Sequence, residues 1–199
     1  PGTIDNDLYG TDVTIGFDTA INTGTHAIDQ IRDTAGSHDR IFLVEVMGRT
    51  SIEIATRVAV CGGAEHVYVP GSKHEVVALA KVLQESQERG KLSSIIIVAE
   101  GKDPGHSEYL KQELKKKFKL DSRVVILGHV QRGGTPSAQD RFMASLMGAE
   151  AINALVKGHS GGAISLVGSH LRLVPFSKIT DKHKAPDKKL LKLVEILAN

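Results

Sequence analysis

The chain has 199 residues, of which 41% are hydrophobic and 24% are charged, and its formal net charge is +2. This composition is typical of a soluble globular protein of one or two domains with a real hydrophobic core. So small an excess of positive charge excludes a nucleic-acid or membrane partner recognised by bulk charge, and any phosphate group must be bound by individually placed Arg and Lys side chains.

The chain contains one cysteine, Cys61, which follows the apolar residues 58–60 and has no second cysteine to pair with. We expect a reduced, buried side chain in a cytoplasmic protein. No apolar run approaches about 18 residues, so the sequence predicts no membrane-spanning segment. The histidines show no close metal-ligand spacing and form no zinc signature.

The first seven residues, Pro1-Gly2-Thr3-Ile4-Asp5-Asn6-Asp7, form a turn rich in acidic and hydroxyl groups. In such a turn Asp5 could accept a proton while Asp7 faces a metal ion, an arrangement that suits phosphoryl transfer. The alternative is purely structural, because Asp and Asn favour turns whatever their function.

Apolar residues then recur at three- and four-residue steps from Val13 to Ile31, which predicts a long amphipathic helix that ends near residues 35–36. Segments of strand and helix character alternate after it. We expect strands at 40–47, 66–69, 94–99 and 124–127, and helices at 51–60, 74–88 and 108–118. The strands are almost continuously apolar, which is typical of a parallel sheet with helices on both faces. The predicted fold is therefore α/β, a three-layer sandwich around a parallel sheet.

Polar residues and glycines follow these strands, at Met47-Gly48-Arg49, at Glu100 and at Gly128-His129. In open α/β sheets the ligand lies outside the carboxyl ends of the strands, so we expect these groups to line one crevice. Beyond them the sequence predicts a Gly-rich loop from 128 to 136, a helix from about 138 to 157, strands at 163–167 and 171–174, a polar stretch from 180 to 187 and a terminal helix.

The opening turn, read with Phe17-Asp18-Thr19-Ala20, Val44-Glu45-Val46-Met47-Gly48-Arg49 and Gly128-His129-Val130-Gln131-Arg132-Gly133-Gly134, resembles the 6-phosphofructokinase family. The resemblance runs in order from Pro1 to about Gly148. In that family a Gly-rich nucleotide-binding region precedes the opening segment, so we expect a C-terminal fragment of a longer enzyme. The resemblance implies that residues 17–128 and 180–199 form a fructose 6-phosphate and effector domain, and that 1–16 and 129–179 are remnants of a nucleotide-binding domain.

Phosphoryl transfer from ATP to a sugar hydroxyl needs a base, cations for the phosphate charge, and donor and acceptor held in line. The resemblance implies that Asp5 is the base for the C1 hydroxyl of fructose 6-phosphate, that Thr3 bonds the transferring group or the sugar, and that Asp7 lies in the Mg²⁺ region. Arg49 would lie near the transferred phosphate. The implied substrate-binding set is Thr3, Ile4, Asp5, Arg40, Met47, Gly48, Arg49, Glu100, Arg123, His129, Val130, Gln131 and Arg132.

Arg49 precedes Thr50 and Glu53, and a Thr and a Glu three residues apart predict a capping box that begins the next helix. Glu100 would accept hydrogen bonds from sugar hydroxyls, since an ionised carboxylate is only an acceptor. Taken alone, Arg49 could be a surface ion pair, Met47 an ordinary core residue and His129 a structural histidine.

Arg123, His129 and Arg132 would bind the 6-phosphate. By resemblance, Arg40 and Arg123 reach the site of a neighbouring subunit, which implies a homo-oligomer, a tetramer in the family.

A second group, Arg32, Gly63, Ala64, Glu65, Arg89 and Lys91, matches positions that bind an ADP-like nucleotide effector in bacterial members of the family. Arg89 and Lys91 would equally suit the macrodipole at a helix C-terminus. The Lys-rich segments 115–119, 182–184 and 188–189 are interpreted as solvated surface.

The phosphoryl donor is indicated by Gly2, which precedes Thr3-Ile4-Asp5. The pyrophosphate-dependent branch of the family usually has Lys there and the ATP-dependent branch Gly, so ATP is favoured. The predicted function is an ATP-dependent 6-phosphofructokinase of glycolysis. The alternatives are the pyrophosphate-dependent enzyme, or a module that binds sugar phosphate and effector without catalysis.

Overall fold

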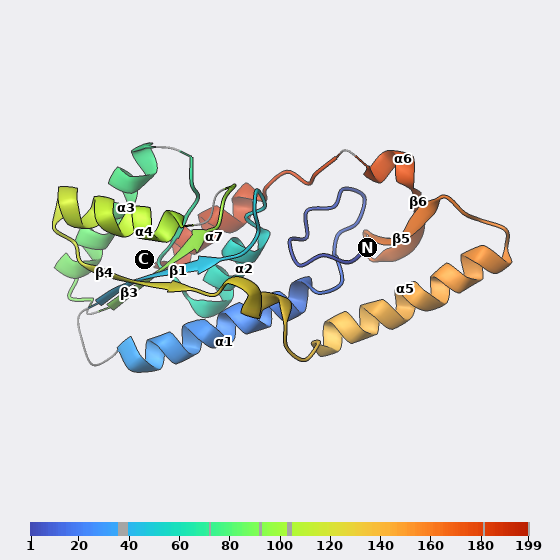
Figure 1. Cartoon of the computed structure of the whole chain (residues 1–199), viewed down its shortest axis with the longest axis horizontal. Coiled ribbons are helices and arrows are strands. Elements are labelled where there is room, and N and C mark those ends of the chain that lie inside the picture. Colours follow the sequence, from blue (N-terminus) through green and yellow to red (C-terminus); the bar gives the residue numbers. More distant parts are fainter. Residues whose placement is uncertain (36–39, 72, 92, 103–104, 181, 199) are drawn as a thin grey trace.

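The computed structural model describes every residue except 36–39, 72, 92, 103–104, 181 and 199. Its core is a parallel sheet of four strands in the order β2-β3-β1-β4. The strands are β1 (Arg40–Val46), β2 (His66–Tyr68), β3 (Ser93–Ala99) and β4 (Ser122–Ile126). The α/β class and the parallel sheet are confirmed (Figure 1).

Helices cover both faces of this sheet because successive strand residues point to opposite sides. On one face, Val44 and Ile97 share a buried cluster with residues of α1 (Phe17–Ala35), α2 (Glu53–Gly62) and α7 (Lys188–Ala198). On the other, Leu43 and Ile96 pack with α3 (Lys73–Glu88), α4 (His106–Glu113) and the short η1 (Leu114–Phe118). The predicted three layers are therefore present.

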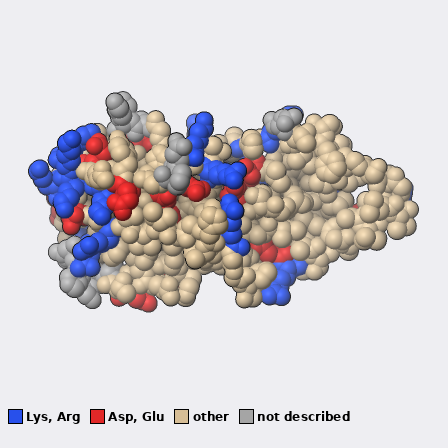
Figure 2. Space-filling model, in the orientation of Figure 1, with Lys and Arg blue, Asp and Glu red and all other residues tan. Residues whose placement is uncertain are grey.

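A second lobe lies beyond the sandwich (Figure 1). It consists of α5 (Ala138–Val156), an antiparallel pair β5 (Gly162–Val167) and β6 (His170–Pro175), and α6 (Phe176–Ile179). Its small core contains Met143, Met147, Ala154 and Ile164. In the view of Figure 2 few charged side chains lie on this lobe, whereas they are frequent over the sandwich. Within the described part of the chain, no helix has the length and apolar character to cross a membrane.

Three local predictions are wrong. The expected capping box is absent, because α2 begins at Glu53 with Ile52, and not Thr50, at the N-cap position. Ser51 Oγ accepts a hydrogen bond from the Glu53 backbone N at 3.3 Å instead. Residues 128–132 are not loop but a 3-10 helix, η2 (Gly128–Arg132). Cys61 is exposed, because the buried face of α2 passes through Val58 and Ala59 instead.

Helices α1 and α2 approach closely at two glycines. A Cβ added to Gly24 would lie 2.6 Å from Val58 Cγ2, and one added to Gly62 would lie 2.8 Å from Ile28 Cγ2. Val58 and Ile28 are fully buried, so they have little room to move. The two glycines therefore set the spacing of the helices behind β1.

Gly24→Ala is expected to lower the free energy of unfolding by about 1–3 kcal/mol, because the added methyl group overpacks the contact with Val58. Gly148→Ala is the matched control: Gly148 also lies in a helix, and a Cβ there would meet nothing within 4 Å. That control should gain roughly 0.5–1 kcal/mol. Urea unfolding followed by circular dichroism measures both, and equal effects would contradict the close contact.

Candidate active site

The opening turn is held by Asn6, which lies between the two carboxylates. Asn6 is 3% exposed and adopts a left-handed backbone with φ of 48°. Its Oδ1 accepts hydrogen bonds from the Thr14 backbone N at 3.0 Å and from Lys184 Nζ at 3.1 Å. Asn is among the few residues that adopt this conformation at modest cost. These bonds fix the directions in which Asp5 and Asp7 leave the turn.

The C-terminal segment is hydrogen-bonded to the same turn. The Lys184 backbone N donates to the Asp7 carbonyl at 2.9 Å, and Lys184 Nζ also donates to the Asp12 carbonyl at 3.0 Å. His183 Nδ1 lies 3.3 Å from Asp7 Oδ2. Burial lowers the pKa of Lys184. The prediction that 182–184 is only solvated surface is thus wrong for Lys184. The local sequence held no signal for it, because its partners lie more than 170 residues away.

Asp5 faces side chains from three other parts of the chain. Burial is the main cause that raises its pKa, and the charge of Asp7 adds to it; Arg49 and Arg132 oppose the rise, and Glu100 contributes to it. Each of these groups is close enough to act electrostatically on the Asp5 carboxyl. The structure therefore brings the opening turn, the ends of β1 and β3, and η2 together around one carboxylate.

The chain after β1 forms a tight loop bound to the chain after β3. Glu100 Oε2 accepts hydrogen bonds from the backbone N of Gly48 at 3.2 Å and of Arg49 at 3.1 Å. Ser51 Oγ donates to the Asp5 carbonyl at 2.8 Å. A Cβ at Gly48 would lie 2.5 Å from the Ser51 carbonyl oxygen, so only glycine fits. Glu100 thus shapes the loop through one oxygen of its carboxylate.

Buried Glu45, which the sequence analysis did not single out, orders the segment that follows Glu100. Its carboxylate accepts hydrogen bonds from the backbone N of Gly105 at 3.2 Å and of Ser107 at 3.0 Å, at the start of α4. His106 Nδ1 then lies 2.9 Å from the Glu100 carbonyl oxygen. A cavity of about 380 Å³ beside this segment is lined by Arg49 and His106. The Arg49 side chain thus borders this cavity as well.

In η2 the four expected binding residues point in different directions. His129 and Arg132 are exposed, and Val130 is 62% exposed. Gln131, by contrast, is 1% exposed, and its Oε1 accepts a hydrogen bond from the Met47 backbone N at 2.8 Å. The Gln131 side chain therefore contacts the protein interior instead of the crevice.

Arg40 and Arg123 lie away from Asp5. Arg40 begins β1 and pairs with Ser93, roughly 20 Å along the strand from Met47. Arg123 is the second residue of β4 and pairs with Phe42 near the same end. Both side chains are exposed at the amino edge of the sheet. They cannot serve the site of their own chain, and their role at a neighbouring subunit stays a prediction.

The expected effector residues gather at this amino edge. Arg32 Nη2 donates to the carbonyls of Gly62 at 2.5 Å and Gly63 at 2.9 Å. Glu65, which is buried, accepts from the Ile95 backbone N and pairs with Lys91 at 2.7 Å. Ala64 is buried between these groups, and Arg89 is exposed just after α3.

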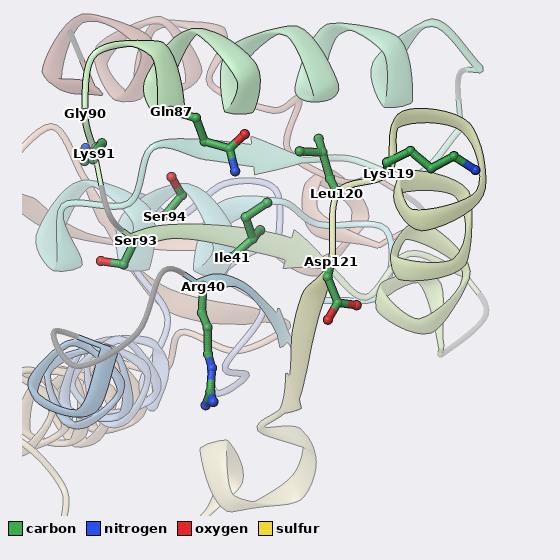
Figure 3. Close-up of a pocket in the computed structure, with 10 residues that line it drawn as sticks. All are labelled: Arg40, Ile41, Gln87, Gly90, Lys91, Ser93, Ser94, Lys119, Leu120 and Asp121. Atoms are coloured by element: carbon green, nitrogen blue, oxygen red, sulfur yellow. The ribbon is translucent and has the colours of Figure 1, made fainter.

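A cavity of about 430 Å³ opens beside Lys91 and is bordered by Arg40, Gln87 and Asp121 (Figure 3). In this view the Arg40 side chain points away from Gln87.

Metal ligands are sparse. Among the described residues no group of three or more His, Cys, Asp and Glu side chains could hold a metal ion. Asp7, the expected Mg²⁺ ligand, has His183 beside one carboxylate oxygen. Mg²⁺ is commonly bound through one or two carboxylates together with substrate phosphates and waters. The donor set fits an ion that takes most of its ligands from a bound nucleotide.

The variant Asp5→Asn is expected to be more stable than the parent at pH 7. A carboxyl group whose pKa is raised by folding makes the protein less stable as the pH rises from the unfolded pKa, near 3.8, through the higher folded pKa. The neutral amide avoids that loss, so the gain should disappear below about pH 4. Unfolding free energies at pH 3.5 and pH 7 test this, and a gain that does not depend on pH would contradict it.

Asn6→Ala should cost about 1–3 kcal/mol of stability, because it leaves the buried Thr14 backbone N without its acceptor. Asn6→Gly loses the same bonds but tolerates the left-handed backbone, so it should be less damaging by about 1 kcal/mol. Thermal unfolding of the two variants separates the hydrogen bonds from the backbone conformation. If Asn6→Gly is no more stable than Asn6→Ala, the left-handed backbone at position 6 costs no free energy.

The family model described as Phosphofructokinase matches residues 1–155 of the chain. The ATP-dependent 6-phosphofructokinase 1 of Thermus thermophilus is 50% identical over 198 residues, covering 100% of this chain and 62% of the relative. The structure of phosphofructokinase from Saccharomyces cerevisiae superposes with a TM-score of 0.79 at 32% identity, covering 98% of this chain and 26% of that one.

A pyrophosphate-dependent phosphofructokinase from Nitrosospira multiformis has a TM-score of 0.77 at 20% identity, with 94% of this chain and 53% of that chain covered. At that identity the likeness concerns the fold alone. The chain spans 62% of the length of the Thermus relative. Since the family model covers most of the chain and agrees with the motifs around the crevice, the chain belongs to the phosphofructokinase family.

Proposed function

We propose that this chain carries the sugar-phosphate site of an ATP-dependent 6-phosphofructokinase. The reaction transfers the γ-phosphoryl group of ATP to the C1 hydroxyl of fructose 6-phosphate and gives fructose 1,6-bisphosphate, a step of glycolysis. The observation that carries the proposal is the set of hydrogen bonds around the loop after β1: Ser51 bonds to the Asp5 carbonyl, Glu100 to Gly48 and Arg49, and Gln131 of η2 to Met47.

Asp5 is the general base in this scheme. Burial and the neighbouring charge of Asp7 raise its pKa and so make the carboxylate a better proton acceptor. Thr3 Oγ1 accepts a hydrogen bond from the Asp5 backbone N at 3.2 Å, which orients the residue. A positioned base typically contributes about 10²–10⁴ in rate.

The other residues bind different parts of the substrate. Arg49, exposed after β1, stabilises the charge of the transferring phosphoryl group, because its guanidinium donors match phosphate oxygens. His129 and Arg132 bind the 6-phosphate. The Oε1 of Glu100 and the loop at Met47 and Gly48 contact the sugar.

Mg²⁺ would be held near Asp7 and would neutralise charge on the phosphate oxygens of the nucleotide. In this scheme Asp7 contributes a carboxylate oxygen, while its contact with His183 holds the side chain in place.

ATP is the favoured donor. Gly2 is exposed, and a Cβ there would meet only the Ile15 carbonyl oxygen at 4.0 Å, so the space above it is open to a nucleotide phosphate. A lysine at this position would place a long cationic side chain there. The Thermus thermophilus relative is named an ATP-dependent enzyme, in agreement with this choice.

The second lobe supports a larger enzyme with two domains. Phe142, Ile152, Leu155 and Val156 of α5 are at least 60% exposed. A groove of about 480 Å³ runs between α5 and the β5–β6 pair. A two-stranded sheet is marginally stable alone, so these surfaces are suited to packing against further strands. We assign 1–16 and 129–179 to a nucleotide-binding domain, and 17–128 and 180–199 to the fructose 6-phosphate and effector domain.

The exposed residues at the amino edge of the sheet support an oligomer and an effector site. Arg40 and Arg123 are exposed far from their own Asp5, as expected if they complete the site of a neighbouring subunit in a homotetramer. An ADP-like effector would bind at Arg32, Gly63, Ala64, Glu65, Arg89 and Lys91. Such an enzyme works in the cytoplasm.

Calorimetry should detect saturable binding of fructose 6-phosphate to this chain, weakened about tenfold or more in Arg132→Ala through loss of charge-assisted hydrogen bonds. Arg172→Ala, which removes an exposed arginine of β6, is the control and should bind like the parent. Equal losses in both variants, or no binding by the parent, would contradict the proposal.

A coupled assay of turnover identifies the phosphoryl donor. It is run with Mg²⁺ and either ATP or pyrophosphate, with and without the added N-terminal part of a relative.

A further inference from the structure

Gln131 is the residue of η2 that turns away from solvent while its neighbours face it. His129 and Arg132 are exposed, whereas Gln131 is 1% exposed. It lies against α1, where a Cβ added to Gly24 would be 3.6 Å from Gln131 Nε2. A fully buried amide between side chains that are exposed points to a task inside the protein.

The hydrogen bond of Gln131 joins the two parts of the crevice. Its Oε1 accepts from the Met47 backbone N at 2.8 Å, across 84 residues of sequence. Met47 begins the loop whose next two backbone N atoms are held by Glu100. The loop that carries Arg49 is thus bound on one side by Glu100, and on the other by the helical turn that carries Arg132.

We propose that Gln131 is a positioning residue that sets the separation of the Arg49 loop from the His129 and Arg132 pair. It would thereby fix the span between the two ends of a bound sugar phosphate. This inference rests on the proposed function of the crevice, and it replaces a direct contact of Gln131 with substrate.

The chemistry of the Gln131 side chain supports this role. Its Nε2 is buried, and no partner for it is found among the described residues. A buried amide nitrogen without a partner costs free energy. An apolar side chain of similar length, such as Met, would fill the space without that cost. A Met at position 131 would, however, lack the amide oxygen that accepts the hydrogen bond from the Met47 backbone N.

The experiment compares the affinities of Gln131→Met and of the parent chain for two ligands. Fructose 6-phosphate spans both parts of the crevice, whereas inorganic phosphate occupies only the part formed by His129 and Arg132. Affinity for fructose 6-phosphate should fall about tenfold or more, and affinity for phosphate, read from NMR shifts, should change less than about twofold. Leu79→Val, in the core on the far face of the sheet, controls for a general loss of stability and should leave both affinities unchanged.

Unchanged affinity for fructose 6-phosphate in Gln131→Met, equal losses for both ligands, or an equal effect of Leu79→Val would overturn the inference. A parent chain that binds phosphate but not fructose 6-phosphate would contradict the proposed function instead. In that case hydrogen exchange at the Met47 amide decides the role of Gln131: faster exchange in Gln131→Met supports it, and unchanged exchange overturns it.

Discussion

The pairing of β1 with both of its neighbours is the constraint on which the crevice depends. Val46 pairs with Ala99 and Glu45 with Ile126, so the three strands end at the same edge. The backbone continues this alignment, since Glu100 N donates to the Val46 carbonyl and Leu127 N donates to the Glu45 carbonyl, each at 3.0 Å. Arg49, Glu100 and Arg132 converge because each follows a strand in this register. A slip by one residue would turn the core residues of β1 to the opposite face.

The opening turn adds a carboxylate to this edge from outside the sheet. Hydrogen bonds connect it to the rest of the molecule at both ends: Lys184 donates to Asn6, and Asp140 joins the start of α1 to α5. The buried Asp140 carboxylate accepts from the backbone N of Gly16 and of Thr19, each at 2.8 Å, at the start of α1, while Asp140 itself lies in the first turn of α5. Negative charge is favourable at helix N-termini, so one side chain stabilises the junction. Separate sets of hydrogen bonds therefore hold the turn that carries Asp5 and the loop that carries Arg49.

The sequence predicted the features that have a local pattern. Continuous apolar strands and the helices between them predicted the three layers. The rule for carboxyl ends of parallel strands predicted that the loop after β1 meets Glu100, and the hydrogen bonds from Gly48 and Arg49 confirm this. It missed Lys184 and the inward turn of Gln131, because their partners lie 178 and 84 residues away and leave no trace in local periodicity. The capping box failed because α2 begins at Glu53, so that Ile52 stands at the N-cap position instead of Thr50.

The proposed crevice at the carboxyl edge would bind the sugar phosphate, whereas the proposed effector residues at the amino edge would not. Backbone NMR of the chain titrated with fructose 6-phosphate tests this difference directly, since the two edges lie at opposite ends of the same strands. We predict shifts at Asp5, Gly48, Arg49, Glu100 and Arg132, and none at Gly63, Glu65 or Lys91 of the proposed effector group. Shifts confined to the amino edge would contradict the account.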